Sequence, residues 1–188
     1  MVDWEARVSS PPASVVSAID IAADAKRDLH AAAMRVKGKK VVGDFDVFLC
    51  HNSGDKPEVR KIGEKLKEHG ILPWFDEWEL RPGLPWQPEL EKQISKIKSA
   101  AVFVGRRGIG PWEDQELRAF LNEFVKRQCP VIPVLLFDKA ARKSGGYGEL
   151  PDLPVFLSAM TWVDFRSKVP DPLERLIWGI TGQRAATE

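Results

Sequence analysis

The sequence has little cysteine and histidine and no long apolar run. Its two cysteines, Cys50 and Cys129, lie in apolar stretches typical of strands, so the disulfide framework of a small secreted domain is excluded. The three histidines are scattered without a ligand spacing, and we expect no metal site. No stretch approaches the ~20 apolar residues of a membrane span, and acidic residues interrupt the N-terminal region. These absences predict a soluble, cytoplasmic protein with no membrane partner.

A charge excess of one sign is also missing. Lys and Arg number 28 against 27 Asp and Glu, which gives a formal net charge of +1. Without a basic field there is no general attraction for nucleic acid, and we expect no direct nucleic-acid partner. The 44% hydrophobic and 29% charged residues are typical of a globular chain, and 188 residues suit one core with an appendage.

The appendage is expected at the N-terminus, over residues 1–40. An alanine-rich segment from Ala13 to Arg35 has apolar residues at roughly helical spacing, which predicts a helix with a weakly apolar face. The basic, glycine-containing stretch Val36–Lys40 is interpreted as a linker and a helix stop at Gly38. The main domain is then expected over residues 41–184. The helix itself is interpreted as a packing or oligomerising element.

In the main domain, short apolar runs alternate with amphipathic segments. This alternation predicts an α/β fold, with a mainly parallel five-stranded sheet covered by helices on both faces. Pro73 cannot donate to a strand ladder, which favours a sheet edge for its strand. The strands are expected at 45–50, 71–75, 100–104, 131–136 and 160–163, and the helices at 56–69, 86–97, 112–126 and 171–182.

Polar loops follow the first three expected strands. In an open doubly wound sheet, ligands bind outside the carboxyl ends of the strands, where the strand order reverses. That rule selects the loops at 50–55, 76–83 and 105–112 as the candidate site.

Three motifs at or beside these loops resemble those of the TIR domain family. The first is Asp46-Val47-Phe48-Leu49 followed by a polar loop and Asp55, and the second is Phe75-Asp76 through Leu80, Pro82 and Gly83, which is similar to the BB loop of the family. The third, Trp112-Glu113-Asp114-Gln115-Glu116, is similar to the Trp-x-x-x-Glu of catalytically active members. The resemblance covers about residues 44–182 and implies a flavodoxin-like, doubly wound fold.

The resemblance implies an NAD+ glycohydrolase or cyclase, with Glu116 as the catalytic residue. Positions four apart share a helix face, so Trp112 and Glu116 are expected to project together. A carboxylate there can stabilise the oxocarbenium character that the ribose develops as nicotinamide leaves. Besides Trp112, the candidates for substrate contacts are His51, Asn52, Ser53, Arg81 and Trp86, and the BB loop residues Asp76, Leu80, Pro82 and Gly83 are expected to take part in assembly.

NAD+ is expected as substrate and no cofactor is required. The resemblance further implies a bacterial immune, antiphage or signalling system, activation by self-association of TIR domains, and a sensor partner or fused sensor domain. Two other functions stay open: a TIR scaffold without activity, and another flavodoxin-like N-glycosidic enzyme such as a nucleoside deoxyribosyltransferase. The acid-rich segment at 113–116 would also stabilise any helix start, whatever its chemistry.

Overall fold

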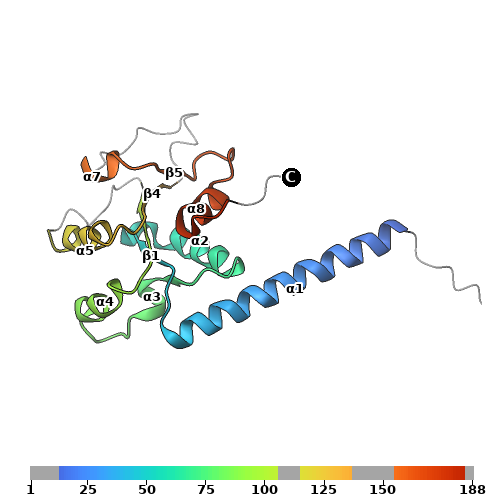
Figure 1. Cartoon of the computed structure of the whole chain (residues 1–188), viewed down its shortest axis with the longest axis horizontal. Coiled ribbons are helices and arrows are strands. Elements are labelled where there is room, and N and C mark those ends of the chain that lie inside the picture. The colour runs from blue at the N-terminus through green and yellow to red at the C-terminus, as the bar shows by residue number, and fades with distance from the viewer. Residues whose placement is uncertain (1–12, 106–114, 137–154, 185–188) are drawn as a thin grey trace, which may run out of the picture.

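The computed structural model describes residues 13–105, 115–136 and 155–184, and their central feature is a parallel sheet of five strands (Figure 1). The strand order is β2-β1-β3-β4-β5. The chain therefore passes from β1 to β2 at one edge, returns to the other side of β1 to form β3, and then continues outward through β4 and β5. This is the flavodoxin-like order, and the predicted fold class is confirmed. The strands are β1 (Val47–Cys50), β2 (Pro73–Trp74), β3 (Ala100–Val104), β4 (Val131–Leu135) and β5 (Val163–Asp164).

Helices cover both faces of the sheet. One apolar cluster joins the sheet to α4 (Trp86–Ile94), α5 (Gln115–Lys126) and α7 (Val155–Ser158). A second cluster joins its other face to α2 (Lys56–Glu68) and α8 (Pro172–Thr181). The buried residues of α2 are Val59, Ile62, Gly63 and Leu66, which lie on one face of the helix.

Successive side chains of each strand enter different clusters. In β1, Val47 and Leu49 pack towards α2 and α8, whereas Phe48 and Cys50 pack towards α4 and α5. All five residues of β3 are buried in the same alternating way. A strand buried on both faces needs apolar residues throughout, which is why these segments are short, continuous apolar runs.

The two strand prolines lie where no ladder donor is required. Pro73 is in β2, at the sheet edge, as predicted. Pro133 is in β4, an interior strand, but the pairing of β4 with β5 begins only at Val134. Leu136 N donates to Val104 O of β3, and the direction of the backbone N–H groups alternates along a strand. The nitrogen of Pro133, three positions earlier, therefore points towards β5, but at a position that precedes the pairing of β4 with β5.

The N-terminal helix α1 (Ala13–Val42) extends away from the domain along most of its length (Figure 1). Its C-terminal part is held at the amino end of the sheet. Lys39 Nζ donates to Asp46 Oδ2 at 2.7 Å, and Lys40 Nζ lies 2.9 Å from Glu79 Oε1. In the described parts of the chain, no helix combines the length and the apolar character needed to cross a membrane.

Three local predictions are wrong. The helix does not stop at Gly38, because α1 continues through the expected linker to Val42. The connection after β2 contains a short helix, α3 (Asp76–Glu79), that periodicity did not indicate. The last strand is Val163–Asp164 instead of 160–163, because β4 sets its register by pairing Val134 with Val163.

Candidate active site

The carboxyl ends of β1 and β3 lie side by side, since Cys50 pairs with Val102, and β2 flanks β1 on the other side. Strand order reverses between β1 and β3, which is the position where doubly wound sheets bind ligands. The loops after β1 and β2 can be followed in the structure, and the loop after β3 is described only at Gly105.

The β1 loop is short and braced. Asn52 caps the single-turn helix η1 (Ser53–Asp55) by accepting a hydrogen bond from Gly54 N at 2.9 Å. The Asp55 carboxylate then reaches across to β3, where it lies so close to Gly105 that a Cβ on that residue would overlap it. With glycine at this position, the carboxylate fits without being displaced.

His51 packs inward beneath the β2 loop. Its ring lies 4.9 Å from that of Phe75, its Nδ1 is 3.0 Å from Leu49 O, and its side chain is only 6% exposed. Its Nε2 lies 3.7 Å from Asp76 Oδ1. The structure therefore joins a residue predicted for substrate binding to one predicted for the BB loop.

Lys56 completes this contact and was missed in the sequence. Its Nζ donates to Asp76 Oδ2 at 2.7 Å and lies 5.9 Å from the centroid of the Phe75 ring. The signal is faint because 20 residues separate the two partners. As the first residue of α2, Lys56 connects the loop after β1 to the loop after β2.

The rest of α3 is held against α2. The Trp78 ring packs edge-on against Phe75, with centroids 4.8 Å apart, and fills the space that a side chain on Gly63 would occupy.

Charged side chains of α2 also contact α3. Lys67 Nζ lies 3.2 Å from the centroid of the Trp78 ring. Partial burial, with the nearby positive charge of Lys40, lowers the pKa of Lys67. Arg60 Nη1 also donates to Glu77 Oε1 at 2.7 Å.

Beyond this base, the BB loop is open to solvent. Leu80 is half-buried against the apolar core, but every residue from Arg81 to Pro85 is exposed. Gly83 has a φ of +87°, which favours glycine, and it lies inside the turn that Leu84 N closes on Arg81 O at 3.3 Å. The loop thus combines a fixed start, Asp76 to Leu80, with a projecting tip.

The remaining predicted residues are placed by backbone only or lie outside the description. Glu116 is the second residue of α5, the helix that follows β3, and Trp86 is the first residue of α4. Trp112 lies outside the described residues. Ser53 is exposed in η1.

Cys50, the last residue of β1, is fully buried. Burial raises the pKa of its thiol well above the usual value, so the thiolate is disfavoured and Cys50 is unsuited as a nucleophile.

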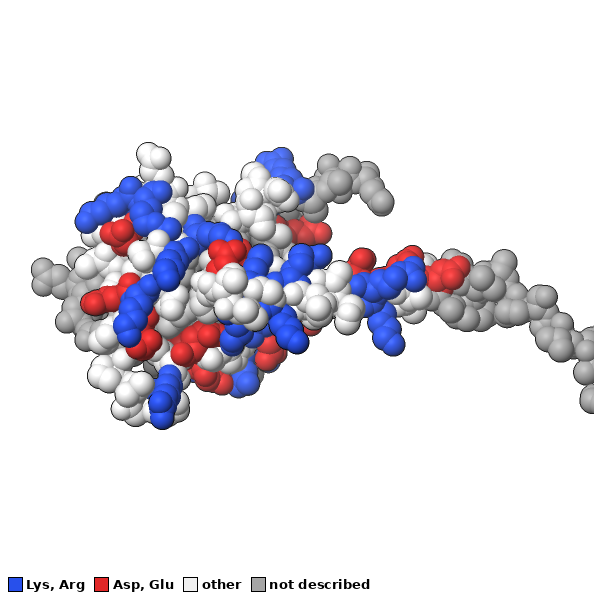
Figure 2. All heavy atoms as spheres, turned by 60° about the horizontal axis from the view of Figure 1, so that its bottom comes forward, with Lys and Arg blue, Asp and Glu red and all other residues white. Residues whose placement is uncertain are grey.

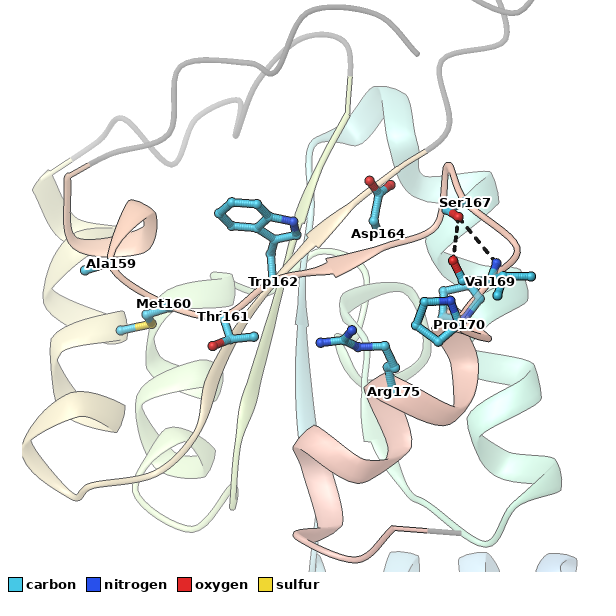
Figure 3. Close-up of a pocket in the computed structure, with 10 residues that line it drawn as sticks. Ala159, Met160, Thr161, Trp162, Asp164, Ser167, Val169, Pro170 and Arg175 are labelled. Carbon is cyan, nitrogen blue, oxygen red and sulfur yellow. Dashed lines mark hydrogen bonds between the residues drawn. The ribbon is translucent and has the colours of Figure 1, made fainter. Parts of the chain in front are cut away.

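A cavity of about 450 Å³ lies elsewhere, at β5 (Figure 3). Arg175 reaches from α8 towards Thr161 there, beside Trp162 and Asp164. Arg166 makes two side-chain hydrogen bonds to Asp164, and these lower the pKa of that carboxyl group. Because β3 and β4 separate β5 from β1, this cavity is distinct from the edge described above.

Comparison with known families defines the class of protein. The sequence matches the TIR domain family over residues 47–177, and the protein belongs to that family. The matched span includes every predicted site residue.

Three known proteins illustrate the similarity. The chain is 29% identical over 111 residues to the NAD(+) hydrolase TcpA of Theionarchaea archaeon, covering 56% of this chain and 34% of that protein. It is 25% identical over 92 residues to the 2' cyclic ADP-D-ribose synthase BtTIR of Bacteroides thetaiotaomicron, covering 48% and 32% of the two chains. These alignments span about a third of each relative. The TIR domain of the Toll-related receptor TRR-2 from Hydra magnipapillata has the same fold, with a TM-score of 0.54, 19% identity, and coverage of 72% of this chain and 98% of that chain.

Proposed function

We propose that this protein cleaves NAD+ between nicotinamide and ribose, and that Glu116 is the catalytic residue. The observation that supports the proposal is the backbone position of Glu116, in the first turn of α5, the helix that follows β3 next to the point where strand order reverses. Similarity to proteins named NAD(+) hydrolase and 2' cyclic ADP-D-ribose synthase supports the choice of substrate.

The chemistry needs one carboxylate. When the bond between nicotinamide and the ribose C1′ breaks, its electron pair goes to the ring nitrogen and neutralises the pyridinium, so the leaving group takes up no proton. The positive charge that develops on the ribose is stabilised by the Glu116 carboxylate. Water then adds to C1′ and loses a proton, giving ADP-ribose, or a nucleophile of the same molecule adds and gives a cyclic product.

The other candidates divide by chemistry. Trp112 and Trp86 would stack on rings, whereas Asn52, Ser53 and Arg81 would contact hydroxyl and phosphate oxygens. His51 would act through its edge, because most of its side chain is packed against Phe75. NAD+ enters here as substrate, and the mechanism requires no cofactor.

Assembly is the second part of the proposal. The exposed tip from Arg81 to Pro85, on a base fixed by Asp76, is suited to contact another TIR domain. We infer that self-association through this BB loop brings the site into its active form. The setting we propose is cytoplasmic signalling in bacterial immunity against phage, with a sensor protein or fused sensor domain as trigger.

The test is nicotinamide release from NAD+ by concentrated protein, followed by chromatography. Glu116→Gln should lower the rate by about 10³-fold or more, because the amide cannot balance the developing charge. Glu123→Gln, on the same helix, is the matched control and should retain the wild-type rate. Equal activity of Glu116→Gln and wild type would exclude Glu116 as the catalytic residue.

A scaffold without enzymatic activity is the second candidate, and the exposed BB loop tip favours it specifically. Under this alternative, Arg81→Ala abolishes self-association while the wild-type protein leaves NAD+ intact even when crowding forces assembly. Glu116→Gln then has no effect on any readout.

A further inference from the structure

The cavity of about 450 Å³ at β5 lies outside the candidate active site and takes no part in the proposed reaction (Figure 3). Its walls come from the segment that leads into β5, the loop after β5 and the start of α8. The loop has hydrogen bonds of its own, because Ser167 Oγ donates to Val169 O at 2.9 Å and accepts from Val169 N at 3.3 Å. A cavity of this size with a braced wall is typical of sites that bind small ligands. Figure 2 shows how far the projecting part of α1 is from such a hollow, since that helix stands clear of the domain.

Arg175 brings a positive charge to the cavity without an acceptor for it. Other half-buried arginines of the chain have acceptors. Arg127 Nη1 donates to Ile94 O at 2.7 Å. Arg166 donates to the carboxylate of Asp164. Among the described residues, by contrast, no hydrogen bond, ion pair or ring contact holds the Arg175 guanidinium, which lines the cavity. A guanidinium that is partly removed from water without an acceptor is unfavourable, so an anion bound beside it would be stabilised.

The carboxylate in the lining does not neutralise Arg175. Asp164 accepts hydrogen bonds from Arg166 Nε at 2.9 Å and from Arg166 Nη2 at 2.8 Å, and Arg166 N donates to it as well at 2.9 Å. The negative charge of Asp164 is therefore balanced within the β5 loop, by an arginine that grips both of its oxygens. Arg175 leaves the cavity with a positive charge, and the ligand that fits this charge is an anion.

Trp162 adds a flat apolar surface next to the charge. Its side chain is 42% exposed and lines the cavity, although the next residue, Val163, is buried in β5. In the part of the chain that the structure describes, no other ring packs against the indole. Figure 3 shows Trp162 on the segment towards which Arg175 reaches from α8. An exposed indole beside a guanidinium suits a ligand that has both a flat ring and an anionic group.

The volume of the cavity sets the size of that ligand. A protein cavity of ~150 Å³ encloses benzene, and about 450 Å³ is roughly three times that volume. A single ring with a carboxylate would leave most of the space to water. A base joined through a sugar to a phosphate fills more of it and places the ring and the anion apart, as Trp162 and Arg175 are.

We propose that this cavity binds a nucleoside monophosphate, with the base stacked on Trp162 and the phosphate at Arg175. The exposed hydroxyl of Thr161 lies between the two and is available to a sugar or phosphate oxygen, since no described residue bonds to it. The site does not rest on the proposed activity, because β3 and β4 separate it from the strand that leads to the candidate active site.

The test is an NMR titration of the full chain with AMP. Wild type should bind AMP with a Kd below about 1 mM. Adenosine and ribose 5-phosphate should each bind at least about five-fold more weakly, because each lacks one of the two recognised groups. A Kd for AMP above about 1 mM, or equal binding of adenosine and AMP, would overturn the proposal.

Variants of the two recognition residues make the test specific. Arg175→Met should weaken AMP binding by at least about ten-fold. Arg184→Met is the matched control, since Arg184 lies just beyond α8, stacked 4.0 Å from the centroid of the Trp178 ring, and its loss should change the Kd by less than about two-fold. Trp162→Leu should weaken binding by about five-fold or more, whereas Trp162→Phe keeps a ring and should lose less. Equal effects of the two arginine variants would contradict the site.

The place of binding is read from the same spectra. AMP is half of NAD+, so binding at the candidate active site must be told apart from binding at β5. The backbone amides that shift with AMP should include those of Thr161 to Asp164 and the start of α8. Shifts confined to the loops after β1 and β2 would place AMP at the candidate active site and overturn the proposal, whatever the outcome of the NAD+ cleavage assay. Urea unfolding of Arg175→Met checks that the domain is intact.

Discussion

The two ends of β1 are built from similar residues but for different purposes. At the amino end, Asp46 is only 8% exposed and accepts hydrogen bonds from Leu72 N at 2.7 Å, Lys39 Nζ at 2.7 Å and Lys98 Nζ at 3.2 Å. At the carboxyl end, Asp76 is about one-third exposed and shares Lys56 and His51 with the loops around it. The amino end of β1 thus has a buried structural carboxylate, Asp46, whereas the carboxyl end has a partly exposed carboxylate, Asp76, in contact with Lys56 and His51.

The difference follows from connectivity. The amino end of β1 receives the C-terminal part of α1 and a backbone donor from Leu72, immediately before β2, so Asp46 is surrounded by protein. The carboxyl end faces loops that lead away from the sheet, where a ligand can approach. We therefore expect polar residues at the amino end of β1 to contribute to stability and those at the carboxyl end to be available for contact with a ligand.

The largest effect on stability should come from Asp46→Ala. It removes the acceptor for a buried backbone N–H and two ammonium groups, and we expect a loss of about 3 kcal/mol. Urea unfolding measures it. The matched control, Asp44→Ala, removes only one exposed contact to Lys98 and should cost less than about 1 kcal/mol. Equal losses in the two variants would contradict the structural assignment of Asp46.

Gly105→Ala tests the packing at the carboxyl edge of the sheet, because its methyl group would displace the Asp55 carboxylate at the candidate site. We expect a loss of stability of about 1–3 kcal/mol from overpacking, together with slower nicotinamide release. Gly38→Ala is the control, since nothing lies within 4 Å of a Cβ there and α1 should gain about 0.5–1 kcal/mol. A neutral Gly105→Ala would mean that Asp55 moves aside freely.

Lys56→Met should have the smallest effect on global stability. Lys56 and Asp76 are each about one-third exposed, so the pair contributes less than about 1 kcal/mol. The change should appear locally, as faster amide hydrogen exchange at Trp78, whose N–H donates to Phe75 O at 3.0 Å. Unchanged exchange at Trp78, with a large loss of global stability, would place Asp76 with Asp46 as a structural carboxylate.

Much of the sheet could be predicted because burial on both faces leaves a strong local signal. The third strand was predicted as 100–104 and is found there, and the edge position of Pro73 follows from its missing donor. The last strand was predicted in the wrong place, because the apolar residues just before Val163 do not belong to the strand. Trp162 is 42% exposed and precedes the pairing with β4, which begins at Val163.

The other misplacements come from tertiary contacts. A glycine inside a helix costs about 1 kcal/mol, and at Gly38 the contacts of Lys39 and Lys40 with the domain offset that cost. The short α3 forms because Trp78 packs against Phe75 and α2. Its partners on α2, Gly63 and Lys67, precede Trp78 by 15 and 11 residues, so local periodicity carries no sign of this packing.

The candidate site was selected from the sequence by topology, and its role stays a prediction. The loops after β1 and β2 were selected by topology, and the structure brings His51 and Asp76 of these loops within 3.7 Å. Lys56 could not be assigned as the link between them, because a lysine at a helix start has many possible partners. The catalytic assignment of Glu116 and the contacts of Trp112 stay predictions.

Because the projecting and docked parts of α1 form one continuous helix, the projecting part has a fixed geometry relative to the domain. Because Lys39 and Lys40 fix its base, every residue along the projecting part has a set height and a set rotation relative to the sheet. Deleting four exposed residues would shorten the helix by about 6 Å and turn whatever is attached beyond them by about 40°. The spacing between the domain and an attached module could therefore be adjusted in small, known steps without altering the core.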